Sequence, residues 1–534
     1  MKNICLNWTI SVLTALFSLF LITTVGFIFH ISINPFYPVF ALLVFMILLA
    51  KLTIKDKKKN AIKSILAQYV FLFDFLILFG VFCYLIPDYS YDGTTYHQAM
   101  IILLKWGLNP VWDNVVQFAN SQEYNFKASV NMVETFLKFF EIIGANIYIV
   151  FEKIELTKIT NFILMLCAFC YSVYTLKNYN FSNLKCCFFS FLLIYNPVCI
   201  YQMFTNYVDG AFYFVFLILL FACINYTKDI DKNKSLYLIC ISSVILSNLK
   251  LTGLFTCVVI SLIFLFIYRS KHLLASFIIA LMLIFISGIN PYYTNLKQGR
   301  NIFYPVIQNS ILNANREGMI TSYPQGFENK NRFEKLFFSL FAESQNLSPL
   351  IESEKTPKLK FPFTIKGDGT FIFSDMRLGG FGYFFSGILL CSLFLSIFIR
   401  FKNKEDKKLF WVVIAILLLT ILGNHEAWWA RFVPQTWMIP LWILIFLNLN
   451  EQNTKQTAVI CSYLIAVICL LNSVIINVQN FLHSKEVATE FYKLIKSKPE
   501  AMYFYKKDMD TNHENETFLI KMREYGIKTI YIDE

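Results

Sequence analysis

Apolar stretches of membrane-spanning length recur along most of the chain and constrain its fold more than any other feature. An α-helix needs about 20 successive apolar residues to cross the hydrocarbon core of a bilayer. The chain is 57% apolar and only 15% charged, whereas a water-soluble protein of this length needs more charge to cover its core. The sequence therefore predicts an all-α polytopic membrane protein. We expect about 13 transmembrane helices, near residues 8–29, 35–51, 65–86, 158–176, 184–202, 208–226, 235–249, 251–268, 272–289, 381–400, 409–423, 434–449 and 456–478.

Lysine and arginine residues gather in loops that this span order places on one side of the membrane. Cytoplasmic loops carry such an excess, which predicts a cytoplasmic amino terminus. It also accounts for most of the net charge of +12, so we expect no nucleic-acid partner. The basic clusters lie within residues 51–63, 228–234, 269–271 and 400–408.

Three large segments then fall outside the cytoplasm, at residues 87–157, 290–380 and 479–534. In the first, apolar positions at helical spacing predict a helix near 128–143, lying on the membrane surface or on the bundle. The last reads as a small α/β unit of helix, strand, helix and strand near 484–497, 502–505, 514–524 and 529–532. It is too short for a large core, so we expect it to lean on the membrane domain, residues 1–478.

Within residues 235–268, Asn248 and Lys250 interrupt an apolar run. A single helix of this length would be about 50 Å long, too long for one crossing. Two shorter spans that meet near Lys250 fit better.

Ionisable residues concentrate where spans are expected to reach the outer surface. A carboxylate among aromatic side chains can serve as a general base when its pKa is tuned, and guanidinium groups neutralise phosphate oxygens. The candidates are Asp88, Asp92 and His97 in the first loop, Asp209 and Lys250 at span ends, Arg300 and Arg377 in the second loop, and Glu426 and Arg431 between the eleventh and twelfth spans.

Each candidate has a structural alternative. Loop solvation would explain Asp88 and the arginines, and turn chemistry would explain Asp209, which precedes Gly210. Gly93 and nearby tyrosines favour a constrained functional site at Asp92. A divalent cation could bind His97, His425, Asp92 and Glu426, but their spacing does not indicate such a site.

Several ordered motifs resemble the GT-C superfamily of membrane glycosyltransferases across roughly residues 65–450. The tail is not covered. The motifs are Tyr91-Asp-Gly-Thr-Thr-Tyr-His97, Leu103-Leu-Lys-Trp-Gly-Leu-Asn-Pro110, Asn196-Pro197 with Gln202, Tyr207-Val-Asp-Gly210, Leu249-Lys-Leu-Thr-Gly253, Asn290-Pro-Tyr-Tyr-Thr-Asn295, Phe303-Tyr-Pro305, Gly379-Gly-Phe-Gly382 and Trp428-Trp-Ala-Arg-Phe-Val-Pro-Gln435.

The resemblance implies transfer of a sugar, usually with inversion, from a polyprenyl-phosphate or polyprenyl-diphosphate carrier outside the cytoplasm. The acceptor would be a glycan, lipid or protein of the cell envelope, and the location the cytoplasmic (inner) membrane of a bacterium. The family's first acidic residue maps onto Asp92, with Asp88 beside it, and the second onto Asp209. The family's paired acidic motif is replaced by Asp88-x-x-x-Asp92, which leaves the catalytic assignment and metal dependence open.

Two other classes of protein fit the composition. One is a transporter or flippase of a lipid-linked or small solute, for which charged residues would meet at mid-depth. The other is a polysaccharide polymerase or O-antigen ligase. A transferase should instead gather its charges at one outer mouth, so we expect Asp92 and Asp209 within about 10 Å of each other, with Arg431 or Lys250 nearby.

Overall fold

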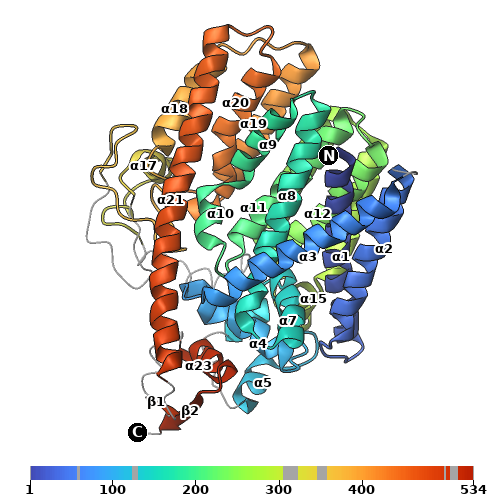
Figure 1. The fold of residues 1–534 in the computed structure, drawn as a ribbon, viewed down its shortest axis with the longest axis vertical. Coiled ribbons are helices and arrows are strands. Elements are labelled where there is room, and N and C mark those ends of the chain that lie inside the picture. Colours follow the sequence, from blue (N-terminus) through green and yellow to red (C-terminus); the bar gives the residue numbers. More distant parts are fainter. Residues whose placement is uncertain are drawn as a thin grey trace.

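The computed structural model describes residues 2–56, 60–122, 130–304, 323–344, 358–497, 501–505 and 515–532, which are mostly helical (Figure 1). Seven of the described helical segments are long and apolar enough to span a membrane. They are α1 (Lys2–Ile28), α2 (Phe36–Asp56), α3 (Ala61–Leu85), the 3-10 turn η2 (Ile154–Lys158) with α8 (Ile159–Asn178), α11 (Asp209–Thr227), α13 (Leu251–Tyr268) and α21 (Gln456–Lys496).

An eighth span results if α14 (Lys271–Ser287) and α15 (Ile289–Lys297), bent by 65° at their junction, count as one broken crossing. The expected helical membrane protein is thus supported, whereas the expected 13 spans are not all confirmed. Six further described helices, each shorter or less apolar, overlap the other predicted spans. They are α9 (Asn183–Ile194), α10 (Pro197–Gln202), α12 (Lys232–Leu249), α18 (Phe385–Ser396), α19 (Lys404–Leu422) and α20 (Met438–Leu449).

The predicted span at 184–202 is broken into α9 and α10. Proline disfavours helical backbone in the residue before it, and Asn196 is accordingly extended. The Asn196 side chain accepts a hydrogen bond from the backbone N–H of Val198, and Pro197 occupies the first turn of α10. The motif Asn196-Pro197 therefore ends one helix and starts the next.

Helix α11 is the buried centre of the bundle, and α8 and α12 pack beside it (Figure 1). As the sequence predicts, α12 and α13 are separate helices, and they meet at Lys250, whose backbone is extended. Gly253 makes this reversal feasible because a Cβ there would lie 1.9 Å from the Leu246 carbonyl oxygen. The turn places Lys250 between the carboxyl end of α12 and the amino end of α13.

The first large loop contains several short helices. They are a π-helical turn η1 (Gly93–His97), α4 (Gln98–Lys105), α5 (Val115–Ser121), α6 (Val130–Thr135) and α7 (Phe139–Phe151). The prediction of one helix over 128–143 is wrong, because Lys138 has non-helical backbone between α6 and α7. Its buried ammonium donates to the Phe136 carbonyl at 2.7 Å and contacts the Asn290 side chain. Helix α7 is largely buried within the protein.

The second large loop contains α17 (Arg332–Phe341), and two 3-10 turns, η3 (Ala430–Phe432) and η4 (Pro434–Trp437), precede α20. Helix α21 has 41 residues and is therefore about 60 Å long, twice the thickness of the hydrocarbon core. It continues without a break through residue 478, where the sequence predicts a domain boundary. Its far end leads to the carboxyl-terminal unit at the bottom of Figure 1.

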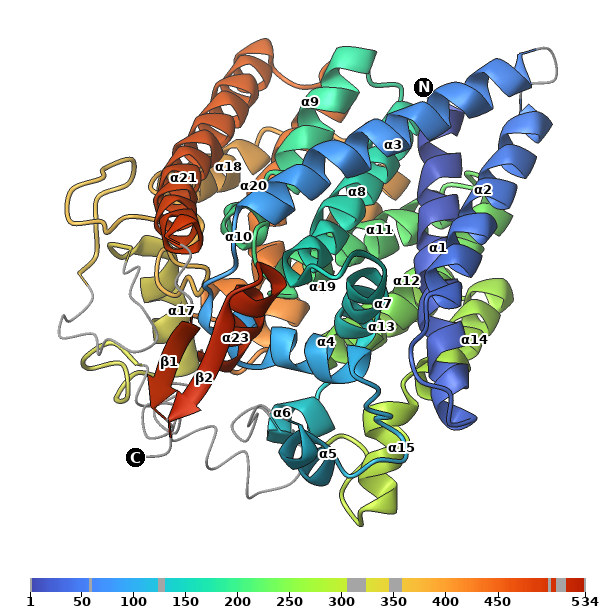
Figure 2. The same ribbon diagram turned by 60° about the horizontal axis from the view of Figure 1, so that its bottom comes forward.

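That unit consists of β1 (Ala501–Tyr505), α23 (Asn515–Glu524) and β2 (Lys528–Ile532), close to the predicted elements. The two strands pair in parallel, from Ala501 opposite Lys528 to Tyr505 opposite Ile532. Helix α23 lies against α4 and η1, as Figure 2 shows. The expectation that this small unit leans on the rest of the protein is confirmed.

Candidate functional site

The guanidinium of Arg431, in η3, contacts carboxylates from three distant segments of the chain. Its Nη1 atom lies 2.6 Å from Asp92 Oδ2 and 3.6 Å from Asp209 Oδ2, and its Nε atom lies 2.7 Å from Asp375 Oδ1. The Asp92 and Asp209 oxygens cannot be farther apart than the sum of the two Nη1 distances, well inside the expected 10 Å. The structure thus brings Asp92, Asp209 and Arg431 together.

Asp92 presents the more accessible carboxylate of this pair. It directly precedes η1, and π-helical turns are frequent at functional sites. The Tyr96 hydroxyl donates to Asp92 Oδ2 at 3.0 Å, the same oxygen that Arg431 contacts. Within the described residues, Asp92 Oδ1 has no hydrogen bond or ion pair, and the side chain is 13% exposed. One oxygen of Asp92 therefore has no partner among the described residues.

The loop before Asp92 is held tightly. A Cβ on Gly93 would lie 2.2 Å from Ser90 Oγ and 2.4 Å from Asp88 Oδ2. Only glycine therefore fits beside Asp92 without displacing these side chains.

Asp209 is more deeply enclosed, with a side chain only 3% exposed. Lys250 Nζ lies 2.5 Å from its Oδ1 atom, and Gln202 Nε2 donates to Oδ2 at 3.2 Å. Asp209 also begins α11, where the helix dipole favours a negative charge. Because both of its oxygens are engaged, Asp209 is better suited to hold Lys250 and Arg431 in place than to accept a proton.

Asp375 completes the group around Arg431, and the sequence did not single it out. Trp429 Nε1 donates to Asp375 Oδ1 at 2.8 Å, and Arg377 Nη2 lies 3.3 Å from Oδ2. Arg377, a predicted candidate, thus belongs to the site through Asp375. The nearest sequence signals were Arg377 itself and the Gly379-Gly380 pair, neither of which points to a carboxylate.

Aromatic side chains form the walls of this site. The Arg431 guanidinium lies 4.9 Å from the Tyr207 and Phe432 ring centroids, and Lys250 Nζ lies 4.5 Å from that of Phe432. Burial raises the pKa of Tyr96 and Tyr207 well above the ordinary value, and the nearby Asp92 carboxylate acts in the same direction. Both phenols therefore remain protonated at neutral pH, and Tyr96 stays a donor to Asp92.

The site has balanced formal charge. Three carboxylates, those of Asp92, Asp209 and Asp375, face three cations, Lys250, Arg377 and Arg431. Lys250 is the most accessible cation of the cluster around Asp209, with 27% of its side chain exposed.

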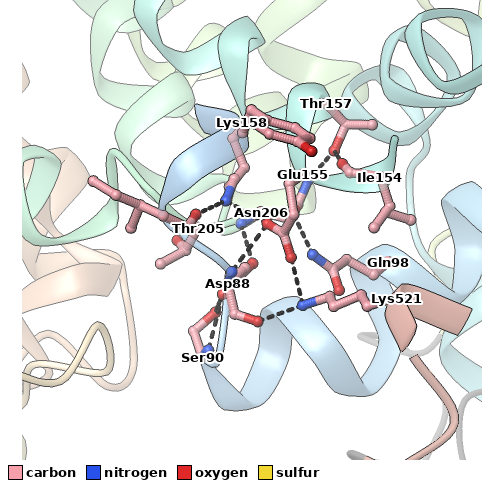
Figure 3. A network of polar contacts seen from close by, with 12 residues as sticks. Asp88, Ser90, Gln98, Ile154, Glu155, Thr157, Lys158, Thr205, Asn206 and Lys521 are labelled. Atoms are coloured by element: carbon pink, nitrogen blue, oxygen red, sulfur yellow. Dashed lines mark hydrogen bonds and ion pairs between the residues drawn. The ribbon is translucent and has the colours of Figure 1, made fainter. Parts of the chain in front are cut away.

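The other predicted residues take their polar partners outside the group around Arg431, although the ring centroid of His97 lies 4.3 Å from that of Tyr96. His97 Nδ1 lies 2.5 Å from the buried Glu141, and Arg300 pairs with Glu134 at 3.0 Å. Asp88 belongs to a separate buried network (Figure 3). The structure therefore does not bring these residues into the group around Arg431, because topology alone does not fix which buried partner a loop residue takes.

Glu426 is also engaged in its own cluster. It accepts hydrogen bonds from the Tyr323 hydroxyl at 2.8 Å and the Trp428 indole at 2.5 Å. Burial alone would raise the pKa of Glu426, but hydrogen bonds from His425, Trp428 and Tyr323 lower it below the ordinary value.

The four residues considered as metal ligands do not form one site. His97 pairs with Glu141, Asp92 with Arg431, and only His425 and Glu426 are in contact. Among the described residues, no group of three or more His, Cys, Asp or Glu side chains is arranged to hold a metal ion.

Comparisons with protein-family models, with curated proteins and with solved structures find no match to this chain.

Proposed function

We propose that the protein is a membrane glycosyltransferase that moves a sugar from a polyprenyl-phosphate-type donor to an acceptor outside the cytoplasm. The observation that carries the proposal is the convergence of Asp92, which has one carboxylate oxygen without a partner among the described residues, with the cations Arg431 and Lys250. A carboxylate can activate the acceptor hydroxyl, and a neighbouring cation can stabilise the phosphate that leaves, so sugar transfer needs both groups close together.

Asp92 would act as the general base. An acceptor hydroxyl is a weak nucleophile at neutral pH, so a base must lie within hydrogen-bonding reach of its proton. The acceptor oxygen would attack the anomeric carbon as the bond from that carbon to the phosphate oxygen breaks. The proton would pass to Asp92 Oδ1, and the lipid phosphate would leave with the electron pair.

Lys250 and Arg431 would compensate the charge of the leaving phosphate. Charge-assisted hydrogen bonds to phosphate oxygens are among the stronger polar contacts in proteins, and they stabilise charge that develops in the transition state. The Lys250 side chain is exposed enough to contact a phosphate, and its ion pair with Asp209 holds it in position. Arg431 holds Asp92 beside it.

The location of these residues supports a transferase over a transporter. Asp209 begins α11, Lys250 separates α12 from α13, and Arg431 lies between α19 and α20. These are helix ends, whereas a transporter commonly binds its substrate near mid-depth on broken helices. A lipid-linked donor could keep its tail in hydrocarbon while its phosphate reaches such a boundary.

The proposal includes the finer topology. The structure supports up to eight spans, and α9 with α10, α12, α18, α19 and η4 with α20 would complete 13 crossings. The amino terminus would then be cytoplasmic, with the site and the carboxyl-terminal unit on the outer side of a bacterial inner membrane. The termini lie toward opposite ends of the long axis in Figure 1, in keeping with this arrangement.

The test uses purified full-length protein, a panel of polyprenyl-phosphate and polyprenyl-diphosphate sugars carrying a radiolabel, and envelope extract as acceptor. We expect release of free lipid phosphate or diphosphate in step with transfer of label. In liposomes, movement of intact labelled donor across the bilayer without its consumption would instead identify a flippase and overturn the proposal.

A further inference from the structure

The carboxyl-terminal unit places a buried lysine against the loop that carries Asp92. Lys521, on α23, is buried, and its Nζ donates to the Asp88 backbone carbonyl at 2.6 Å (Figure 3). The same Nζ lies 2.7 Å from the Glu155 carboxylate. Lys521 thus reaches two segments that are more than 300 residues away in the sequence.

Asp88 connects two of the three segments that carry the site carboxylates, those of Asp92 and Asp209. Its Oδ1 atom accepts from the Ser90 backbone N–H at 2.8 Å, and its Oδ2 atom accepts from the Asn206 backbone N–H at 2.7 Å. Ser90 is two residues before Asp92, and Asn206 is three residues before Asp209. The Asp88 carboxylate therefore links the backbone just before Asp92 to the backbone just before Asp209.

Glu155 holds Asp88 from the other side, accepting from the Asp88 backbone N–H at 3.0 Å and contacting Lys158. We call Asp88, Glu155, Lys158 and Lys521 the Asp88 network. All four side chains are buried, and their formal charges cancel. Burial raises the pKa of Asp88, whereas Lys521 and Lys158 act to lower it. Loss of Lys521 would leave a buried negative charge uncompensated, which is costly.

Further contacts hold the unit at both ends of the first loop. At one end, the Tyr492 hydroxyl of α21 donates to the Tyr84 carbonyl at 3.0 Å and lies 3.3 Å from the Tyr525 hydroxyl of the unit. At the other, the Glu524 carboxylate accepts from the Ile154 backbone N–H at 3.1 Å, and Lys153 Nζ lies 4.3 Å from the Tyr525 ring centroid. The docking of Lys521 is therefore specific in geometry.

We propose that Lys521 is a positioning residue: by docking the carboxyl-terminal unit under Asp88, it fixes the Asp92 and Asp209 segments relative to each other. The site is then complete only when the last part of the chain has folded onto the first external loop. The catalytic role of Asp92 in this inference rests on the proposed function, but the docking does not.

Hydrogen exchange tests the docking without any substrate. In full-length Lys521→Met we expect the backbone amides of residues 88–97 and 205–210 to exchange on the order of 10²-fold faster, since breaking a buried charge pair is strongly destabilising. The double variant Lys521→Met/Glu155→Gln removes one charge of each sign, so it should exchange more slowly than Lys521→Met alone. Lys493→Met is the matched control, because Lys493 lies on the exposed surface of α21.

Two exchange results would contradict the inference. Unchanged exchange in Lys521→Met, or a double variant at least as perturbed as Lys521→Met, would overturn the inference. Once a donor is known, turnover should separate the two proposals. Lys521→Met should lower kcat with little change in KM, and Glu155→Gln should partly rescue it, whereas loss through Asp92→Asn should not be rescued. Altered exchange with unchanged kcat would mean that the unit docks but does not position the site.

Discussion

Arg431 organises the candidate site by binding three carboxylates at once. Its planar guanidinium presents five donors in a fixed geometry, whereas a lysine ammonium is a point charge on a flexible stem. The contacts with Asp92, Asp209 and Asp375 use two different guanidinium nitrogens. A lysine at this position would keep the charge and lose the geometry.

We therefore expect Arg431→Lys to be destabilising, although it conserves charge. A lysine ammonium cannot reach all three carboxylates from this position, and each lost hydrogen bond to a charged group costs about 1.5–3 kcal/mol, so the thermal unfolding midpoint in detergent should fall clearly. Arg400→Lys, at an exposed position, is the matched control and should leave the midpoint unchanged. An Arg431→Lys midpoint equal to that of the control would show that the three contacts contribute little.

At this scale the sequence predicted part of the site. Asp92, Asp209, Lys250 and Arg431 come together, because each follows or precedes a helix end that the apolar pattern locates. Arg377 joins them from the second large loop through Asp375. Asp375 was missed since it lies in a long loop without periodicity. Asp88, His97, Arg300 and Glu426 were assigned to the site, but each has its own buried or partly buried partner, which local sequence does not reveal.

At the scale of elements, we expect the docking of α23 to depend on pH. Burial raises the pKa of Glu524 to about 7, despite hydrogen bonds from Tyr148 and Ile154 and the nearby Lys153, which act to lower it; Glu155 acts to raise it. The folded state thus holds a proton that the unfolded state releases near pH 4.5. Its stabilising contribution is complete below the unfolded pKa and is lost as pH rises through about 7.

We expect protection of α23 amides from hydrogen exchange, corrected for intrinsic rates, to decrease between pH 5 and 7 and then level off. Glu524→Gln, which stays neutral, should largely remove this dependence. Glu490→Gln, at an exposed position, should retain it. The same pH dependence in Glu524→Gln as in the unaltered protein would assign the effect to another group.

The elements themselves were predicted to different degrees. The division between α12 and α13 at Lys250 and the strands of the carboxyl-terminal unit follow from local pattern. The helix expected over 128–143 is divided because the buried Lys138 contacts Asn290, more than 150 residues away. Such a contact overrides helical periodicity and cannot be read from the segment alone.

At the scale of the whole molecule, orientation in the membrane is the least constrained property. Length and hydropathy identify seven spans, or eight with the bent pair, whereas the basic loops and apolar runs together predict 13. Shorter helices such as α9 and α18 account for part of the difference between these two counts. A 12-residue helix is only about 18 Å long, so it needs flanking residues to cross the membrane.

A reporter that is active only in the cytoplasm, fused after Glu534, tests the orientation. We expect no reporter signal, since an odd number of crossings from a cytoplasmic amino terminus leaves the carboxyl terminus outside. The same reporter fused after Arg400, in a predicted cytoplasmic loop, should be active. Strong activity after Glu534 would contradict the 13-span arrangement and the external position of Lys521.

The general-base assignment is the centre of the proposed function, and Asp92→Asn tests it most directly. The substitution is nearly isosteric but removes the proton acceptor, so transfer by purified protein should fall by about 10²–10⁴-fold. Arg431 keeps its contacts with Asp209 and Asp375 in this variant, so the protein should remain folded and bind the donor. Asp229→Asn, at an exposed position, should transfer at the unaltered rate. Turnover by Asp92→Asn close to that of the unaltered protein would contradict the account and remove Asp92 as the base.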